Sequence, residues 1–432
     1  MSARVPAPLV AYRLGLTLLE PAALGLLAWR RRRGKEDPAR IGERRGIPGR
    51  LRPEGVPLVW VHGASLGETL AVMPVVERLT QQGLAVLVSS GTRTSAELVA
   101  RRLPPGAAHQ YVPLDVPRYV ERFLDHWRPD LALFAESEIW PNLLLSLDRR
   151  GIPRVLLNAK LSERSFARWV RYPAVAQSLF AGFALCLAQS EEDGGRLLRL
   201  GAPRVSVVGN LKFDAPAPPA DPREVARLSG LVADRPLWVA ASTHPGEEEI
   251  ICATHRELVA RHPRLLTIVV PRHPERGGDV VALGGAEGLR VAQRSKGEAP
   301  EAGTDLYVAD TVGELGLFYR LSPLVYMGKS LVPHGGQNPI EAAKLGSALL
   351  HGPHVHNFTA IFAAFDGAGG ALAVPDGEGL TRALGDLLAD PALVRDMARA
   401  AAEVAAEHGG ALERTLRAIA PLVPRTAVGA AG

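Results

Sequence analysis

The chain has 432 residues, enough for two or three domains, and its 47% hydrophobic and 22% charged residues are close to the averages of folded globular proteins. This composition excludes wholesale disorder, collagen-like repeats and long coiled coils. Two cysteines, Cys186 and Cys252, are too few for a disulfide framework and lack the spacing of metal ligands. Because such sparse cysteine use is typical of a reducing compartment, we expect the body of the protein to be cytosolic.

Positive charge is concentrated at the N-terminus. The chain carries 50 basic and 45 acidic residues, but residues 1–60 hold 12 basic and only 5 acidic ones, so the rest is nearly neutral. A nucleic-acid-binding protein is expected to spread Lys and Arg over one face and to interleave aromatic residues, which make up only 5% here. The charge pattern therefore argues against nucleic acid as a partner.

An apolar segment with a basic end follows the first residues. Residues 9–29 are mostly Leu, Ala and Gly, with Glu20-Pro21 near the middle, and residues 30–33 are all Arg. The segment is near bilayer length, but a charge at the centre of a spanning helix costs about 2.5–3.5 kcal/mol. Arginines after the apolar stretch do not match a secretory signal, which carries its charge before it. We therefore expect a helix that lies on, or inserts shallowly into, an anionic membrane surface; the alternative is a buried helix with a solvated basic end.

Beyond residue 36, short apolar runs alternate with helical stretches, as in parallel α/β sheets. Residues 214–222 interrupt this alternation with four prolines in nine residues, which is a linker composition, and the alternation then restarts. The sequence therefore predicts two doubly wound halves, with ligands bound at the carboxyl ends of the strands, in a cleft between the halves. The predicted strands are 58–61, 84–88, 131–134, 155–157, 205–208, 237–241, 265–270, 324–327 and 348–350.

The first half holds carboxylates directly after two predicted strands. In HGASLGE (62–68), Ser65 and Glu68 have the spacing of a capping box, in which the Glu only satisfies a backbone donor; a role in a site is the alternative. Glu136 and Glu138 are concentrated in a turn that proline ends. Such a pair can orient hydroxyl groups or transfer protons, although it can equally cap the following helix.

The second half holds features that suit a phosphate. Arg272 follows a strong predicted strand and is well placed to bind a phosphate. In GGQNPIE (335–341), Asn338 is predicted as N-cap, Pro339 as the first helical residue and Glu341 as the third, so that backbone N–H groups face a ligand. Glu341 would then accept hydrogen bonds from ribose hydroxyls. A well-capped helix accounts for these residues too, but not for the two glycines.

Two further kinds of site are not expected. His351, His354 and His356 are close in sequence, but no carboxylate or thiolate completes a zinc ligand set, so we predict no metal site. The chain also lacks the G-x-x-x-x-G-K-[ST] loop that nucleotide hydrolysis of the P-loop kind requires.

In these motifs and their order, the chain resembles the 3-deoxy-D-manno-octulosonic acid (Kdo) transferases of lipopolysaccharide assembly over nearly its full length. The chain departs from the family pattern at two places. The residues between His62 and Gly67 differ, and Val312 stands where Met is common; both are small apolar changes. The motifs that carry the resemblance are HGASLGE (62–68), ESEIWPN (136–142), NAKLSER (158–164), GNLKFD (209–214), PRHPER (271–276), DTVGELG (310–316) and SLVPHGGQNPIEAA (330–343).

The resemblance implies the GT-B glycosyltransferase fold, an α/β fold in which two Rossmann-like domains face a central cleft, with an N-terminal membrane-associating helix. On this basis we expect a membrane-associating segment at 1–36 and an N-terminal acceptor domain at 37–213. A proline-rich linker at 214–222 and a C-terminal CMP-Kdo-binding domain at 223–424 would follow.

The resemblance also implies inverting transfer of Kdo from CMP-Kdo to lipid IVA, a lipid A precursor, without metal or cofactor, at the cytoplasmic face of the inner membrane. Glu68 would be the general base, and Glu138 and Lys212 would stabilise the transition state. The implied CMP site consists of Pro271, Arg272, Val312, Gly313, Glu314, Asn338, Pro339, Ile340 and Glu341.

Two other functions stay open at this point. A nucleotide-sugar epimerase of the 2-epimerase kind would share the paired Rossmann halves and the GGQNPIE-like loop, but it would leave the N-terminal segment unexplained. A non-catalytic membrane protein that binds nucleotide sugars is the other alternative, and the presence of Glu68, Glu138 and Lys212 together weighs against it.

Overall fold

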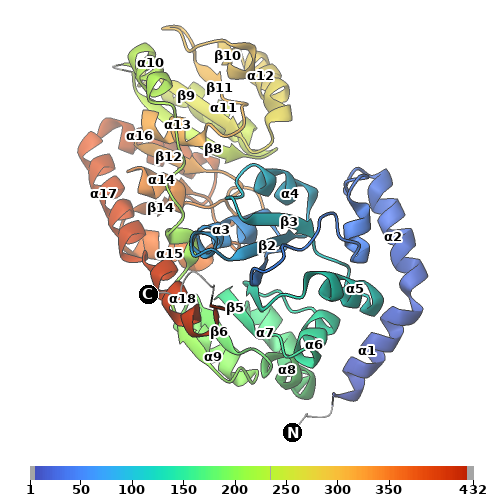
Figure 1. Ribbon diagram of the computed structural model, residues 1–432. Helices are drawn as coiled ribbons and strands as arrows, with labels where there is room; N and C mark the ends of the chain where they lie inside the picture. The colour runs from blue at the N-terminus through green and yellow to red at the C-terminus, as the bar shows by residue number, and fades with distance from the viewer. Residues whose placement is uncertain (1–4, 234, 426–432) are drawn as a thin grey trace. The chain divides into compact units, whose positions relative to one another are not determined.

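The computed structural model describes residues 5–233 and 235–425, which form two compact units (Figure 1). The first unit contains the chain up to Ala215 and again from Gly409 onward, and the second is Pro216–His408. Each unit is built on a seven-stranded sheet in which every strand pair is parallel. The predicted α/β class with two Rossmann-like halves is therefore confirmed.

The first sheet has the strand order β3-β2-β1-β4-β5-β6-β7. The chain winds outward from β1 through β2 to β3 and then returns to the other side of β1 with β4, so the winding direction reverses between β1 and β4. Helices cover both faces, which explains the nearly continuous apolar runs in the central strands. The strands are β1 (Leu58–His62), β2 (Ala85–Ser90), β3 (Ala107–Tyr111), β4 (Leu131–Ala135), β5 (Arg154–Ala159), β6 (Leu185–Ala188) and β7 (Val205–Val207).

Helices pack on the two faces of this sheet over separate apolar cores. Trp60, Phe123 and Trp127 lie in one core, and Val61 and Val75 lie in the other; all five side chains are buried. From residue 41 onward, the helices of the first unit are α3 (Leu66–Gln81), α4 (Arg93–Ala100), α5 (Pro117–Trp127), α6 (Pro141–Arg149), α7 (Glu163–Val170), α8 (Pro173–Phe180), α9 (Glu191–Arg199) and α18 (Ala411–Ile419), with short 3-10 turns η1 (Ile41–Arg45), η2 (Leu211–Phe213) and η5 (Ala420–Leu422).

The C-terminal helix α18 belongs to the first unit, although the sequence predicts one domain over 223–424 (Figure 1). Ala411 and Ile419 are buried in the same core as α3. The carboxylate of Asp214 accepts hydrogen bonds from the N–H groups of Gly410 (2.6 Å) and Leu412 (2.7 Å), which lie at the start of α18. An apolar helix face can pack on either sheet, so local pattern does not show which sheet it will cover.

The second sheet repeats the same design, with the order β10-β11-β9-β8-β12-β13-β14, and its winding reverses between β8 and β12. Its strands are β8 (Leu237–Thr243), β9 (Leu266–Pro271), β10 (Val291–Gln293), β11 (Leu306–Val308), β12 (Leu324–Met327), β13 (Ala348–His351) and β14 (Ala371–Ala373). Its helices are α10 (Pro222–Val232), α11 (Glu247–Leu258), α12 (Gly277–Ala286), α13 (Leu315–Leu321), α14 (Ile340–Lys344), α15 (Thr359–Gly367), α16 (Gly377–Ala389) and α17 (Pro391–Glu407), with 3-10 turns η3 (Pro274–Arg276) and η4 (Arg294–Lys296).

Two helices, α1 (Ala7–Leu18) and α2 (Glu20–Arg32), stand where the sequence predicts one. They are bent by 63° at Leu19, just before Pro21, whose ring and missing N–H disfavour a continuous helix. In the described part of the chain, no single helix is long and apolar enough to cross a membrane. The two helices of this pair reach that length and apolar character only when they are taken together. Most of its apolar side chains are exposed, with Leu18 81% exposed.

An ion pair between a buried arginine and a partly exposed aspartate gives a stability prediction. Arg154 at the start of β5 is fully buried, contacts Asp148 (3.1 Å) and Phe183, and has two further guanidinium nitrogens without a hydrogen-bond partner. Removing the carboxylate with Asp148→Ala should therefore lower the free energy of unfolding by about 1–3 kcal/mol, because the buried guanidinium loses its charged partner. Removing the charge with Arg154→Met should cost little or even stabilise the fold. Equal losses for the two variants in chemical denaturation would contradict this.

Candidate functional site

The carboxyl edge of the first sheet brings together the side chains predicted to be catalytic. Glu68 lies in the first turn of α3 directly after β1, Glu138 follows β4, and Lys212 lies in η2 after β7. β1 and β4 are the neighbouring strands between which the winding reverses. Ligands of open α/β sheets bind at this point, because the loops after the two strands diverge there and leave room.

Glu68 is both a capping residue and a half-buried acid. The Ser65 hydroxyl accepts a hydrogen bond from the Glu68 N–H (3.3 Å) and donates one to the Glu68 carboxylate (2.7 Å). The other carboxylate oxygen accepts a hydrogen bond from the backbone N–H of Ala64 (2.9 Å). In a standard capping box it would instead accept from the backbone N–H of Ser65, the N-cap residue. Burial and the negative charges of Glu138 and Glu136 raise the pKa of Glu68, and the bonds from Ser65 and Ala64 oppose this rise only in part.

Glu138 is held by two aromatic side chains. One carboxylate oxygen, Oε2, accepts a hydrogen bond from Trp140 Nε1 (2.6 Å) and lies 3.3 Å from His62 Nε2. Burial alone would raise the pKa of Glu138, but its interactions with His62 and Trp140 outweigh burial and lower it. The pKa values of Glu68 and Glu138 therefore shift in opposite directions, an arrangement that suits one carboxylate that accepts a proton and a second that stays ionised.

Lys212 is paired with Glu136. The sequence alone did not predict this pair. The ammonium donates a hydrogen bond to Glu136 Oε1 at 2.6 Å. Glu136 and Asn158 both have left-handed backbones, with φ of 54° and 50°, at the ends of β4 and β5. Asn158 Oδ1 also accepts from the N–H of Leu211 (2.9 Å), which fixes the turn that carries Lys212. Strained backbone of this kind concentrates at functional sites.

Asp115, which sequence reasoning missed, anchors the loop that carries Glu138. Its carboxylate accepts hydrogen bonds from the N–H groups of Asn142 (3.0 Å) and Leu143 (2.9 Å) at the start of α6. It also accepts one from the Tyr12 hydroxyl in α1 (3.0 Å), so the N-terminal helix pair and this loop share one buried carboxylate.

In the second unit, the predicted CMP residues all lie at the carboxyl edge of the sheet, at the end of β9 or after β9, β11 and β12. Arg272 is exposed, and its N–H donates a hydrogen bond to the Thr243 carbonyl at the end of β8 (3.0 Å). The charges of Arg272 and Glu341 both act on the hydroxyl of Tyr319, although burial is the main reason why the pKa of Tyr319 is raised well above its usual value. Arg272 and Glu341 are therefore close enough to the same buried tyrosine for their charges to influence its pKa.

The segment after β11 presents a carboxylate that already has partners. Glu314 forms a two-point ion pair with Arg294, with both N–O distances 2.5 Å, and accepts a hydrogen bond from Thr311. The hydrogen bond from Arg294 is the main reason why the pKa of Glu314 is lowered. Val312 is 75% exposed, and Gly313 has a φ of 85° that favours glycine.

The glycine-rich loop after β12 differs from the prediction by one residue. Helix α14 begins at Ile340 with Pro339 at the N-cap position, and Asn338 Oδ1 accepts from the N–H of Ile340 (3.2 Å). The side chain of Ile340 is buried, so it faces the core instead of a ligand. Gly335 has a φ of 97°, and a Cβ there would lie 2.4 Å from the Asn357 amide nitrogen. The loop's own conformation therefore requires this glycine.

Glu247 holds this loop in place and was not predicted. Although it stands in a run of three glutamates that is typical of an exposed helix start, Glu247 is fully buried. Its carboxylate accepts hydrogen bonds from the N–H groups of Lys329 (2.6 Å) and Ser330 (2.9 Å) and from the Tyr326 hydroxyl (2.6 Å). The shared acceptor ties the start of α11 to the loop after β12.

His351 has protein partners in place of a metal. Its Nε2 lies 3.0 Å from Asp366 Oδ1, and its Nδ1 lies 2.7 Å from the Gly352 carbonyl. Within residues 5–233 and 235–425, no group of three His, Cys, Asp or Glu side chains is arranged to hold a metal ion.

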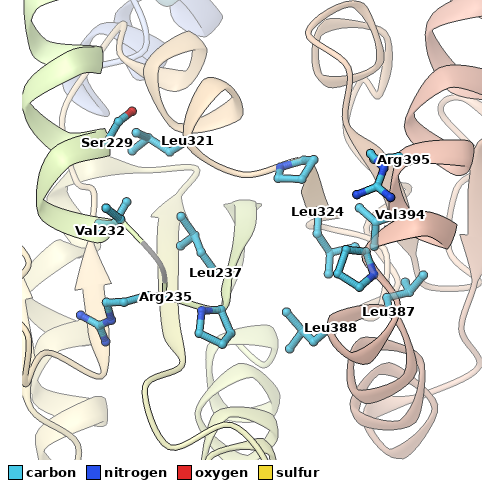
Figure 2. Close-up of a pocket in the computed structure, with 14 residues that line it drawn as sticks. Ser229, Val232, Arg235, Leu237, Leu321, Leu324, Leu387, Leu388, Val394 and Arg395 are labelled. Carbon is cyan, nitrogen blue, oxygen red and sulfur yellow. The ribbon is translucent and has the colours of Figure 1, made fainter.

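A cavity of about 560 Å³ opens at the opposite edge of the second sheet, where β8 and β12 begin (Figure 2). Its walls are mainly apolar and come from Leu237, Leu321, Leu324, Leu387 and Val394. The predicted CMP residues lie at the carboxyl ends of the strands, where ligands of such sheets bind, so this cavity is separate from them.

The family model and the sequence relatives of this chain agree on one family. The family model described as "3-Deoxy-D-manno-octulosonic-acid transferase (kdotransferase)" matches residues 39–215. The chain is 36% identical to the 3-deoxy-D-manno-octulosonic acid transferase of Haemophilus influenzae over 411 residues, which cover 93% of this chain and 95% of the relative. It is also 36% identical to that of Bordetella pertussis over 423 residues, covering 94% and 98%. A UDP-GlcNAc 2-epimerase structure from Neisseria meningitidis shares the fold, with a TM-score of 0.58 at 15% identity, covering 85% of this chain and all of that one.

Asp115 gives a prediction for the pH dependence of stability. Burial raises the pKa of Asp115 to about 6, against an ordinary value of 3.8, although its hydrogen bonds oppose the rise. Because the folded state holds this proton more tightly, the group stabilises the fold fully below about pH 4, and this contribution is lost as the pH rises through about 6. The unfolding free energy of the wild type should therefore fall relative to that of Asp115→Asn, by up to roughly 3 kcal/mol, between about pH 4 and 7. A difference that stays constant or grows with pH would contradict this.

Proposed function

Because the chain belongs to the 3-deoxy-D-manno-octulosonic acid transferase family of glycosyltransferases, we propose that it transfers Kdo from CMP-Kdo to lipid IVA with inversion at the anomeric carbon. The observation that carries the proposal is the position of Glu68 at the reversal point of the first sheet, with a raised pKa, beside a second carboxylate whose pKa is lowered. A base whose pKa lies closer to neutrality accepts a proton from a hydroxyl more effectively than an ordinary glutamate does.

In the proposed reaction, Glu68 takes the proton of the acceptor sugar hydroxyl. The oxygen attacks the anomeric carbon of Kdo from the face opposite the leaving group, and the bond from that carbon to the CMP phosphate oxygen breaks. The bonding electrons leave with CMP, and Glu68 ends protonated. The bonds from Ser65 and Ala64 hold the Glu68 carboxylate in place without neutralising it.

Glu138 and Lys212 would stabilise charge that develops during this step. A fixed carboxylate favours positive charge at the anomeric carbon, as in glycoside-cleaving enzymes. The Lys212 ammonium, held by Glu136 at 2.6 Å, offers a cation to the carboxylate of the Kdo group. Because Lys212 and Glu136 form a close pair, neither requires the substrate for its charge to be compensated.

The carboxyl edge of the second sheet would bind CMP. Pro271 and Arg272, Val312–Glu314 and the loop through Asn338 to Glu341 lie along this edge. Arg272 is exposed there and is the side chain best suited to neutralise the departing phosphate. Because the Ile340 side chain is buried and its N–H already donates to Asn338, we assign Ile340 a structural part in this loop. We propose no part for a metal ion.

The helix pair α1–α2 would attach the enzyme to the cytoplasmic face of the inner membrane, where its lipid acceptor lies. Leu14, Leu18 and Leu19 are 60%, 81% and 56% exposed. Such exposure of apolar side chains is unfavourable in water and becomes favourable when they insert into a lipid interface. Arg31 and Arg32 follow at the end of α2, and each basic residue near an anionic surface contributes about 1 kcal/mol.

The direct test is transfer itself. Wild-type protein in detergent, with lipid IVA, freshly generated CMP-Kdo and chelator, should increase the mass of the lipid by one or more Kdo residues, as measured by mass spectrometry. Glu68→Gln removes the proton acceptor and should lower kcat by about 10²–10⁴-fold. Glu97→Gln, an exposed residue of α4, is the matched control and should retain wild-type turnover. Full activity of Glu68→Gln would exclude it as the base, and no mass gain with the folded wild type would contradict the proposed reaction.

Membrane attachment is tested with anionic phospholipid vesicles. The double variant Leu14→Asp/Leu18→Asp should bind vesicles at least about tenfold more weakly than the wild type, because it loses two apolar contacts with the interface. Wild-type binding should also weaken with salt, because the basic end of α2 is screened. Leu51→Asp, which alters an 89% exposed leucine outside the helix pair, is the control. Equal binding of both variants in a sedimentation assay would rule out attachment through α1.

A further inference from the structure

We propose that His62 is a positioning residue that holds the Glu138 carboxylate through Nε2, and that Ser89 and Trp60 hold His62 in turn. The inference rests on the proposed function, because it assigns His62 a part in the same reaction. It adds a chain of four side chains, three of them fully buried in the core of the first unit.

The sheet register creates this chain. His62 is the last residue of β1, where it pairs with Ser89 of β2 on one side and with Phe134 of β4 on the other. Trp60 and His62 are two residues apart on β1, so their side chains leave the same face of the sheet. Glu138 follows β4 and meets His62 from the neighbouring strand.

Hydrogen bonds link the four side chains one after another. Trp60 Nε1 can only donate, and it donates to Ser89 Oγ at 2.8 Å. Ser89 Oγ lies 2.9 Å from His62 Nδ1, and His62 Nε2 lies 3.3 Å from Glu138 Oε2. Because an ionised carboxylate accepts only, Nε2 must carry the hydrogen that faces it. His62 Nδ1 also lies 3.2 Å from the Ser89 carbonyl oxygen, so the hydroxyl and the carbonyl of Ser89 both hold this end of the ring while Nε2 points its hydrogen at Glu138.

The contacts of Glu138 divide its carboxylate into a held side and a free side. Both His62 and Trp140 bind Oε2. Among the described residues, Oε1 has no hydrogen-bond donor, and the side chain is 14% exposed. Two donors on one oxygen therefore fix the carboxylate while leaving the other oxygen available to a substrate.

The aromatic surroundings of His62 restrict its movement. Its ring lies edge-to-face with Phe134, with centroids 6.1 Å apart, and Trp60 packs against Phe134 and Phe123. A ring held in this way cannot turn away from Glu138 without opening the core. A displacement of about 1 Å in a reacting group can cost a hundredfold in rate, so this restraint matters for turnover.

The test compares two neighbouring serines of β2. Ser89 contacts His62, whereas Ser90 is equally buried and contacts His109 Nε2 (2.9 Å), away from Glu138. Ser89→Ala should lower kcat for Kdo transfer severalfold with little change in the KM for CMP-Kdo, and Ser90→Ala should retain the wild-type kcat. Thermal unfolding of both variants measures any general loss of stability. Because the two serines are equally buried, this loss should be similar for both.

Two variants of His62 itself test its donor. His62→Leu removes the donor and should lower kcat about 10- to 100-fold, again with little change in KM for CMP-Kdo. His62→Gln places an amide N–H near the position of Nε2 and should recover part of this loss, which a role in core packing alone would not predict. If His62→Leu does not fold, the serine pair decides the question.

The outcomes separate this inference from the proposed function. An inactive, folded wild type overturns the proposed function, and with it the role assigned to His62. With an active wild type, the inference is overturned if Ser89→Ala matches Ser90→Ala in kcat, or if a folded His62→Leu retains wild-type kcat. It is also overturned if His62→Gln recovers nothing relative to a folded His62→Leu.

Discussion

The parallel arrangement of each sheet is the constraint on which the rest of the structure depends. Because all strands of a sheet run in one direction, every loop that follows a strand emerges at the same edge, and the reversal of winding opens that edge at one point. Glu68, Glu138 and Lys212 are 144 residues apart in sequence from first to last, yet all three follow strands of one sheet. Their proximity is a consequence of topology, and local hydrogen bonds only adjust it.

Glu68 is both a capping residue of α3 and the proposed general base. The contacts that fix Glu68 at the start of α3 also leave its pKa raised, since a hydroxyl and an amide stabilise the charged carboxylate less than a cation would. Asp115 and Glu247 do comparable work for the loops after β4 and β12, each by accepting several N–H groups. Buried carboxylates are costly unless they are hydrogen-bonded in this way, so each one makes its loop conformation nearly obligatory.

The central strands and the acidic residues at their ends could be predicted from the sequence, because β1, β4 and β9 are continuous apolar runs with polar residues directly after them. Strand β3 was missed because its His109 and Gln110 interrupt the apolar pattern; they are buried through bonds to Ser90 and Trp127. The three-residue strands β10, β11 and β14 are too short to show a period. His62 and Asp115 were missed for another reason: their partners, Glu138 and Asn142, are 76 and 27 residues away, and no local pattern reports such pairs.

The Tyr12–Asp115 hydrogen bond has a consequence for shortened forms of the enzyme. Removing the apolar helix pair to obtain a protein that needs no detergent would also remove the Tyr12 hydroxyl from Asp115, while the two N–H donors of α6 remained. Water would then reach a carboxylate that is now only 7% exposed, at the base of the loop that carries Glu138. Such a truncation therefore alters the hydrogen bonding behind the site as well as the proposed attachment to lipid, and a loss of turnover in the shortened protein would have two separate physical origins.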